Sequence, residues 1–420
     1  MNNRRFVFLM VLLSLFFLPG ILPAEETEGK SADNFKLALQ AALTRHPRVR
    51  SLEAELKSLG FNLDAEKSRR LPSIGVSAQT MTDEDYYGLV RIQQVLTSFG
   101  KIEGAIALEN QRVSVKQAEL FFLYRTLIEE TAAAYIRLWG SKQRLIVAGE
   151  NLAGHDDLYQ MILRRSKGGI ASEADVGLAF SRLLQATAQR DQFAGAVEKA
   201  RNDLNALTQI PFSADEPVDP DLMVLSSSNA ILQDALANEA SLKVRQEEVE
   251  LVRREAKLAR SELNPTLYLR FDQYLGDYSG NSYDSRIGIA LEGSLEGMGV
   301  TGKKRVQAEF ARVEAAEGQV EAMRNDIRRR VSSLLADVRT NESVGVTYGL
   351  AAAERQATLE SFLRQFDAGR KSWLDVLNSQ SEVFEMRHML VQSKINWMEA
   401  SLRLAALVGQ LDQLAGNETK

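Results

Sequence analysis

An internal repeat constrains the fold of this chain more than any other feature of its sequence. Residues 169–207 and 369–407 carry the same residue types at a separation of 200 positions. The matching pairs are Gly169/Gly369, Ser172/Ser372, Asp175/Asp375, Val176/Val376, Leu204/Leu404, Ala206/Ala406 and Leu207/Leu407. A second match, at a separation of 193, aligns Pro72 with Pro265, each between a helix-like segment and a short alternating one. The chain is therefore predicted to contain two similar halves, and its function must suit two similar units.

Composition indicates a mostly helical protein without cysteine chemistry. The 420 residues include only 8 prolines, and strong helix formers such as Ala, Leu, Glu and Arg dominate. The absence of cysteine excludes disulfides, thiol chemistry and a lipid attached to cysteine. The three histidines are far apart, and no catalytic signature occurs, so we expect neither enzymatic activity nor a metal or other cofactor. Without clustered basic charge, we expect no nucleic-acid partner.

The N-terminus has the pattern of a signal peptide over residues 1–24. Arg4 and Arg5 precede an apolar run from Phe6 to Leu18, and Ala24 is a plausible cleavage point. The alternative is an uncleaved anchor, but the run of about 13 residues is shorter than the roughly 20 needed to span a membrane. Removing both arginines takes Lys+Arg from 51 to 49 against 56 Asp+Glu, a net charge of −7.

Each half contains two alternating segments that are predicted to form a hairpin, over about 73–97 and about 266–295. Strands of about ten residues with one apolar face have the size of a transmembrane β-strand, which presents that face to lipid. A soluble hairpin packed on helices is the alternative. The predicted lipid-facing residues are Val90, Ile92, Leu96, Leu267, Leu269, Phe271, Ile287, Ile289 and Leu291.

A very long helix follows each hairpin, over about 101–165 and about 303–365. The first run has no proline and would measure roughly 100 Å. Two apolar stripes, one through Leu127 and Ala134 and one through Leu108 and Val115, each repeat every seven residues, so the helix should have neighbours on two sides.

Return helices are predicted over about 172–208 and about 372–410. In both turns glycine ends the long helix, and Ser172 or Ser372 caps the next one together with Asp175 or Asp375. The two carboxylates are therefore interpreted first as helix-start residues. A linker over 212–228 separates the first repeat, 25–211, from the second, 229–414, and 415–420 form a tail.

Four strands cannot close a transmembrane barrel, because the smallest such barrels have eight and an open edge cannot lie in lipid. Three copies would supply 3 × 4 = 12 strands, an even number in the permitted range. The predicted fold is mainly α with a small β part. Its duplicated long helices form an α-barrel, and each chain adds four strands to the 12-stranded transmembrane β-barrel of a homotrimer.

The residues at the strand ends and turns resemble the TolC-type outer membrane efflux proteins, also called outer membrane factors. The resemblance covers about Phe35 to Leu414 and rests on Leu71-Pro72, Gln94-Val95-Leu96, Ser98-Phe99-Gly100-Lys101 and the two turns with Gly169…Asp175-Val176 and Gly369…Asp375-Val376-Leu377. It implies a channel in the outer membrane of a Gram-negative-type cell, with a long periplasmic part. The implied partners are outer membrane lipid, a periplasmic adaptor protein and an inner-membrane pump or ABC exporter.

The resemblance also implies roles for the two turns. The adaptor would dock on the tips, at Gly168, Gly169, Ser172, Gly369, Arg370 and Ser372. At the periplasmic entrance, Asp375 matches the first of two acidic residues, whereas the second position is Asn378. Lys371 matches a basic residue four positions before the acid, and Asp175 belongs to the other tip. A single ring of three carboxylates would then remain to select cations.

The predicted function is an exit duct that passes small molecules, such as drugs and toxic compounds, from the pump through the adaptor to the outside. The alternative is the outer membrane component of a type I secretion system that exports a protein. A more remote alternative is a periplasmic coiled-coil scaffold.

A GxGxxG motif, Gly297 to Gly302, stands between a strand and a helix, as in a dinucleotide site. The long helix that follows leads to no second parallel strand, and the equivalent place in the first half has a single glycine. We therefore expect no nucleotide binding.

Overall fold

The computed structural model describes residues 31–80, 86–218, 228–275, 285–294 and 296–416. The predicted signal peptide, most of the linker and the end of the tail lie outside these ranges.

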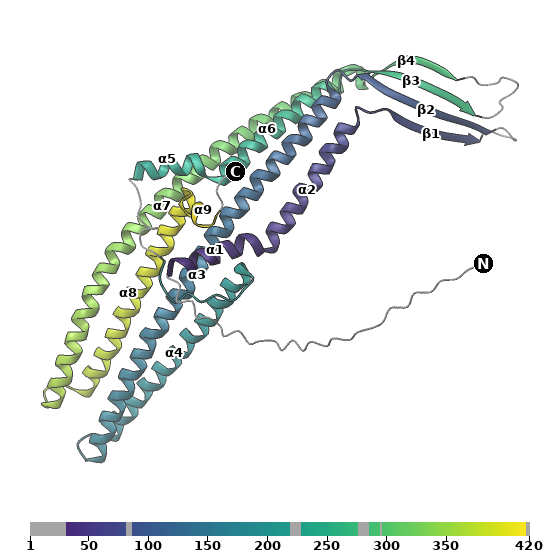
Figure 1. Ribbon diagram of the computed structural model, residues 1–420. Helices are drawn as coiled ribbons and strands as arrows, with labels where there is room; N and C mark the ends of the chain where they lie inside the picture. The colour runs from purple at the N-terminus through teal and green to yellow at the C-terminus, as the bar shows by residue number, and fades with distance from the viewer. Residues whose placement is uncertain (1–30, 81–85, 219–227, 276–284, 295, 417–420) are drawn as a thin grey trace, which may run out of the picture.

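The same order of elements occurs twice along the chain (Figure 1). The first half contains α1 (Ser31–Arg45), α2 (Pro47–Ser68), β1 (Ser73–Thr80), β2 (Tyr86–Thr97), α3 (Lys101–Lys167) and α4 (Glu173–Thr208). The second half contains α5 (Ser228–Asn238), α6 (Ala240–Ser261), β3 (Thr266–Leu275), β4 (Arg286–Glu292), the 3-10 helix η2 (Glu296–Gly299), α7 (Val300–Asp367), α8 (Trp373–Leu407) and α9 (Gln410–Leu414). The protein is mainly helical with a small β part, as predicted.

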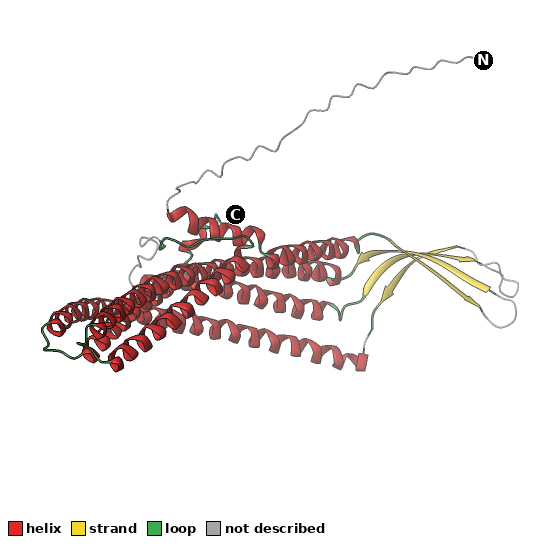
Figure 2. Ribbon diagram, turned by 90° about the horizontal axis from the view of Figure 1, so that it is seen from below, coloured by secondary structure: helices red, strands yellow, loops and turns green. Residues whose placement is uncertain are grey.

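The long helices form a curved wall from which the strands extend at one end (Figures 1 and 2). Near the sheet, α3 packs against α2 and α6, and α6 packs against α7. Toward the opposite end, α3 packs against α4 and α8, and α8 packs against α7. The long helix α3 therefore has neighbours on two sides, as predicted. Residues of both of its apolar stripes are buried, namely Leu108, Val115, Leu127 and Ala134.

Local capping explains where several helices begin and end. α2 begins with proline at its first turn, where the missing N–H costs nothing, and His46 accepts a hydrogen bond from the Arg48 backbone N–H at 3.2 Å. His46 is a buried cap, and burial, with the nearby Arg48 charge, lowers its pKa.

The second return helix is shorter than predicted. α8 ends at Leu407 instead of about 410, because Gly409 has a left-handed φ of 85° that breaks the helix before α9. The Arg125 guanidinium holds the Asp412 carboxylate of α9 against α3 at 2.5 Å. α7 begins at Val300, three residues before the predicted start at 303, so Thr301 and Gly302 of the GxGxxG motif lie inside a helix.

Three apolar clusters hold the helices together. The first surrounds Tyr135 and Leu138 where α1, α3, α4 and α8 meet, and the second joins α5, α6, α7 and α8 around Val331 and Leu404. The third lies at the tips, far from the sheet. No helix in the described part of the chain is long and apolar enough to cross a membrane.

Candidate functional site

The two turns at the far end of the helices, here called the first tip (168–176) and the second tip (368–376), share one backbone conformation. Gly169 and Gly369 have φ of 71° and 72°. In each tip the residue after this glycine donates its backbone N–H to the carbonyl five residues earlier, Ile170 to Arg165 at 2.9 Å and Arg370 to Gln365 at 2.8 Å. This bonding satisfies carbonyls that a helix end otherwise leaves unpaired.

Both return helices begin with the same capping box. The Ser172 hydroxyl accepts from the Asp175 backbone N–H at 3.1 Å, and the Asp175 carboxylate accepts from the Ser172 N–H at 3.3 Å. In the second tip Ser372 and Asp375 make the same two contacts at 3.2 and 3.3 Å. Asp175 and Asp375 are therefore helix-start residues, which is how the sequence pattern was first interpreted.

Of the four residues predicted for the entrance, the structure brings Lys371 and Asp375 together. The Lys371 ammonium lies 3.6 Å from the Asp375 carboxylate and 4.1 Å from the centre of the Phe362 ring. The hydrogen bond from the Ser372 hydroxyl, followed by the Lys371 charge, lowers the pKa of Asp375. An ionised, half-exposed carboxylate with a cation beside it therefore stands on the second tip.

Asn378 makes a different contact. Its side-chain oxygen accepts a hydrogen bond from Arg182 of α4 at 3.3 Å, so it links the two helical hairpins α3–α4 and α7–α8. Asp175 takes part in the cap of the first tip, and its hydrogen bonds within the described residues are to Ser172 and not to the other three.

An apolar cluster joins the two tips, and the sequence did not reveal it. Trp373 is buried, its ring lies 5.1 Å from that of Phe366, and both pack near Leu158, Ile162 and Leu359. The remaining members of the cluster are Ala179, Val376, Leu377 and Val383. The large side chain of Trp373, for which sequence analysis had no role, therefore anchors the second tip to α3.

An ion pair adds to this contact between the tips. The Arg165 guanidinium lies 2.5 Å from the Asp367 carboxylate and 4.5 Å from the centre of the Phe366 ring. The repeat gave no signal for this pair, because the counterpart of Arg165 is Gln365 and the counterpart of Asp367 is Lys167.

A buried histidine lies farther along the same contact. His155 of α3 is 3% exposed, and its Nδ1 has no hydrogen-bond partner among the described residues. Burial, followed by the Arg182 charge, lowers the pKa of His155 to about 4. This histidine is neutral at pH 7 and can act neither as a cation nor as a surface ligand.

The sheet is the second candidate region. Its strand order is β1-β2-β3-β4, with every neighbour antiparallel. Ile92 pairs with Ile74 and Phe271, and Phe271 pairs with Ile287, so these side chains share one face. The same registers place on this face all the predicted lipid-facing residues except Leu96, which lies at the register shift between Val95 and Thr97 and has no pairing partner.

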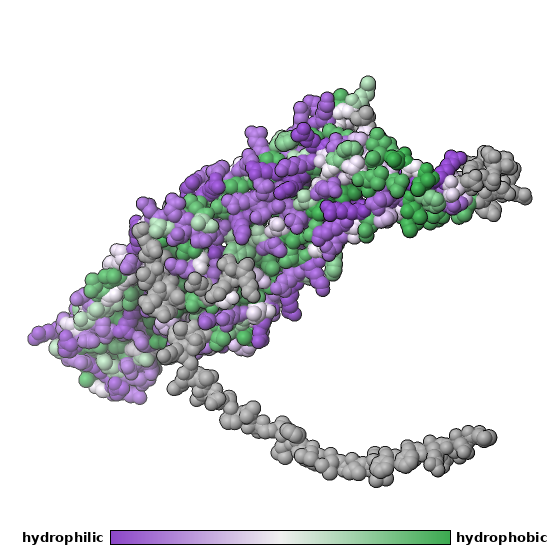
Figure 3. Space-filling model, turned by 45° about the horizontal axis from the view of Figure 1, so that its top comes forward, coloured by the Kyte–Doolittle hydropathy of each residue, from purple (hydrophilic) through white to green (hydrophobic). Residues whose placement is uncertain are grey.

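The two faces of the sheet differ strongly in polarity. On one face Ile74, Val76, Ile287 and Ile289 are about 70% exposed or more, and Figure 3 shows hydrophobic side chains gathered over the strands. On the other, Arg91 donates two hydrogen bonds to Asp272 at 2.8 and 3.2 Å, and a second ion pair joins Arg270 to Glu292. Such a sheet is built to separate an apolar from a polar environment.

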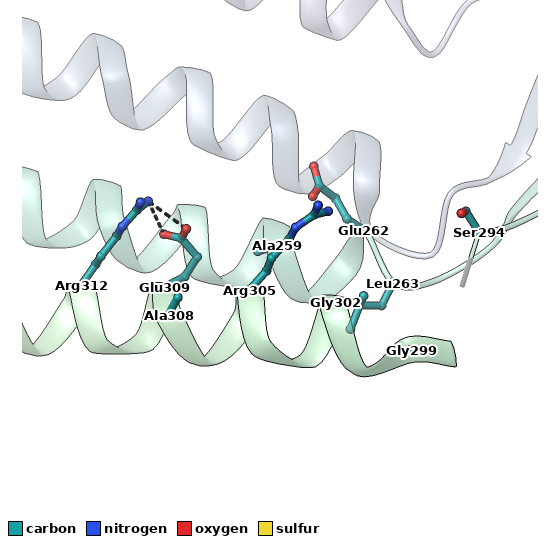
Figure 4. A pocket seen from close by; sticks show the side chains of 10 residues that line it. All are labelled: Ala259, Glu262, Leu263, Ser294, Gly299, Gly302, Arg305, Ala308, Glu309 and Arg312. Atoms are coloured by element: carbon teal, nitrogen blue, oxygen red, sulfur yellow. Dashed lines mark hydrogen bonds and ion pairs between the residues drawn. The ribbon is translucent and has the colours of Figure 1, made fainter. Parts of the chain in front are cut away.

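The GxGxxG segment borders an open cavity of about 490 Å³ between the end of α6 and the start of α7 (Figure 4). A side-chain carbon on Gly302 would lie 2.2 Å from Leu263, so this glycine permits close helix packing. Gly299 has a φ of 84° and ends the turn before α7. Helix packing and the turn therefore explain why glycine stands at both positions. The residues that line the cavity include the acidic Glu262 and Glu309.

Comparison with known proteins agrees with this architecture. The sequence matches the family model described as outer membrane efflux protein over residues 38–208 and 231–410. It is 21% identical to outer membrane protein TolC of Escherichia coli, over 91% of this chain and 83% of TolC. It is 23% identical to the outer membrane efflux protein BepC of Brucella suis, over 90% of this chain and 86% of BepC.

Solved structures show the same fold. A membrane protein from Pseudomonas aeruginosa superimposes with a TM-score of 0.77 at 16% identity, covering 90% of this chain and 93% of its own. The outer membrane protein VceC of Vibrio cholerae gives a TM-score of 0.74 at 16% identity, covering 92% and 97%.

The chain belongs to the outer membrane efflux protein family. It is an outer membrane protein with a long periplasmic helical part, as predicted, and its general role is that of an exit duct. A family of channel proteins supports the expectation that the chain is not an enzyme.

Proposed function

We propose that three copies of this chain form one channel through the outer membrane and the periplasm. The observation that carries the proposal is the sheet, which has one exposed apolar face and two open edges. Among the described residues, no strand pairs with the outer edge of β1 or of β4. Three copies joined edge to edge supply 3 × 4 = 12 strands and remove every open edge.

The length of the longest strand supports a membrane position. β2 has 12 residues, which at about 3.3 Å each extend about 40 Å, and a tilt of about 40° reduces the height to about 30 Å. That height equals the thickness of the hydrocarbon core. The apolar face would then contact lipid, and the face that carries Arg91 and Asp272 would line a water-filled interior.

The helices have open edges on the same two sides as the sheet. On one side lie α4, α2 and β1, and on the other lie α7 and β4. Exposed apolar side chains occur along both sides, Phe61, Phe180 and Leu184 on the first and Phe310, Val346 and Leu350 on the second. Packing the first side of one copy on the second side of the next would bury both sets and close a helical tube.

The two tips form the periplasmic end of this tube. We propose that a periplasmic adaptor docks on the exposed turns, at Gly168, Gly169 and Ser172 and at Gly369, Arg370 and Ser372. Three copies of Asp375 would form a ring of negative charge at the entrance, partly offset by Lys371, with Asn378 one turn farther along α8.

The proposed cargo rests on the duct architecture and on the family to which the chain belongs. A passive duct needs an energised partner, and in this proposal an inner-membrane pump delivers the substrate through the adaptor. Membership of the outer membrane efflux protein family favours small molecules as the cargo. Export of an unfolded protein from an ABC exporter uses the same duct and is the other outcome of the test below.

Extraction and conductance test the channel itself. The full chain should stay in the membrane fraction after washing with carbonate, run as a trimer in mild detergent, and produce discrete single-channel steps in a planar bilayer. Release by carbonate alone would contradict the channel and support a periplasmic coiled-coil scaffold. Ile289→Asp, which buries a charge in the lipid face, should abolish insertion, whereas Ser77→Asp on the opposite face should not.

A deletion strain tests the cargo. If small molecules pass, the strain becomes sensitive to drugs or toxic compounds, and the full-length chain restores resistance. If instead a secreted protein disappears from the medium while drug sensitivity is unchanged, the secretion assignment replaces the efflux assignment.

A further inference from the structure

Each half of the chain passes from its last strand to its long helix through a pair of left-handed residues. Phe99 and Gly100 have φ of 49° and 96°, and Met298 and Gly299 have φ of 58° and 84°, with Gly297 before them also left-handed at 55°. Glycine adopts this conformation freely, whereas a residue with a side chain is strained in it. Glycine in both positions would make the turn without strain, so the two large apolar side chains need a separate reason.

Both side chains project into solvent. Phe99 is 51% exposed and Met298 is 96% exposed. The corner at Phe99 is held in place, because its carbonyl accepts a hydrogen bond from Asn264 at 2.9 Å and its N–H donates to Thr97 at 3.3 Å. The exposure of the Phe99 side chain is therefore a property of a fixed corner.

The corners continue the apolar face of the sheet toward the helices. Exposed apolar residues flank the helix-proximal strand ends, and they are Leu71 before β1, Leu96 near the end of β2, Leu291 near the end of β4 and Val300 at the start of α7. Beyond them the helical surface is largely hydrophilic (Figure 3). The corners thus mark the boundary between an apolar and a polar zone.

Lysines follow both corners directly. Lys101 begins α3, and Lys303 and Lys304 are the fourth and fifth residues of α7. Neither Lys101 nor Lys303 makes an ion pair with a residue that the structure describes, and Lys304 donates only to Gln307 at 3.1 Å. Nearby carboxylates have other contacts, since Glu103 accepts from Ser98, Glu292 pairs with Arg270, and Glu262 points toward Arg305 in Figure 4.

We propose that the two left-handed corners form a lipid-binding site at the periplasmic boundary of the membrane. Phe99 and Met298 insert among the acyl chains just below the headgroups, and Lys101, Lys303 and Lys304 bind the phosphates of anionic glycerophospholipids. Long lysine side chains reach from apolar surface to headgroups, and each adds attraction to an anionic leaflet. This inference rests on the proposed membrane function.

Tryptophan fluorescence tests the depth of the corners. The natural tryptophans, Trp139, Trp373 and Trp397, lie in α3 and α8, so we expect brominated lipid to leave the wild-type trimer unquenched. Phe99→Trp and Met298→Trp, each reconstituted as the full chain, should be quenched more by lipid brominated near the headgroup than by lipid brominated near the chain end. Ile146→Trp, on an exposed part of α3 far from the sheet, is the matched control and should not be quenched.

Ile289→Trp separates failure of this inference from failure of the channel. If Ile289→Trp is quenched and both corner variants are not, the strands contact lipid and the corner proposal is wrong. If Ile289→Trp is not quenched either, the membrane function itself is wrong.

The lipid class is tested with brominated phosphatidylglycerol and brominated phosphatidylcholine at equal mole fraction. We expect stronger quenching of the corner tryptophans by phosphatidylglycerol, and loss of that preference in Lys101→Gln/Lys303→Gln/Lys304→Gln, while quenching of Ile289→Trp is unchanged. Equal quenching by the two lipids before substitution would overturn the anionic-headgroup assignment.

Discussion

The two tips have the same backbone and different packing. Each has a glycine in the left-handed region, followed by a serine–aspartate capping box with nearly identical hydrogen bonds. At the first position of the return helix, however, Glu173 is exposed and Trp373 is buried. The shared caps therefore fix the shape of both turns, and the side chains alone decide which turn is anchored to the neighbouring hairpin.

Truncating the anchor should have the largest effect. We expect Trp373→Ala to lower the free energy of local opening at the second tip by about 3–5 kcal/mol, the usual cost of emptying a buried aromatic site. Amide hydrogen exchange of residues 366–380 measures this change. Glu173→Ala, at the equivalent position of the first tip, should leave exchange there unchanged, and equal acceleration in both variants would contradict the difference between the tips.

A second contrast lies about three helical turns from the tips, where buried His155 of the first half corresponds to exposed Arg355 of the second. Arg355 pairs with Glu382 at 2.7 Å. The pKa of His155 falls to about 4 from the ordinary 6.5. As the pH is lowered, His155 is therefore protonated in the unfolded chain before it is protonated in the folded one. Stability from the neutral side chain is therefore complete above about pH 6.5 and is lost as the pH falls toward 4, by up to about 3 kcal/mol.

Hydrogen exchange around residue 155 at pH 7, 5.5 and 4.5 tests this pH dependence. His155→Gln should remove the pH dependence that arises from the imidazole of His155, whereas Arg355→Gln should leave that pH dependence unchanged. An unchanged pH profile in His155→Gln would show that His155 does not titrate in this range.

The sequence predicts well what depends on local chemistry. Glycine, serine and aspartate at fixed offsets determine each tip, and alternation in the strands places Ile92, Phe271 and Ile289 on one face. Seven-residue spacing likewise indicates that α3 has neighbours on two sides.

Features that depend on distant contacts were missed. The burial of Trp373 and the Arg165–Asp367 pair require two hairpins that only the fold brings together. The pairing register does not assign Leu96 to a face, because a bulge interrupts the alternation, and α8 ends before about 410 because Gly409 breaks an otherwise helical pattern.

Ion selectivity tests the charge difference between the tips. We expect Asp375→Asn to lower the cation-to-anion permeability ratio of the trimer by about twofold, a modest change because Lys371 already offsets each carboxylate. Asp175→Asn removes the same capping contact from the first tip and should leave the ratio unchanged. Because the pKa of Asp375 is lowered from 3.8 by Ser372 and Lys371, the preference should persist below pH 3.8. Equal effects of the two substitutions would remove Asp375 from the entrance.

The smallest expected effect is at the ion pair between the tips. Arg165 and Asp367 have side chains 28% and 62% exposed, so their attraction should contribute less than about 1 kcal/mol and should weaken with salt. The chain has no cysteine, so spin labels on cysteines at Ile170 and Arg370 report the distance between the tips specifically. Arg165→Gln should broaden the distance distribution slightly at low salt only, whereas Arg355→Gln, which breaks a pair inside the second hairpin, should not change it. A distribution unaffected by Arg165→Gln and broadened by Trp373→Ala would mean that apolar packing alone holds the tips together.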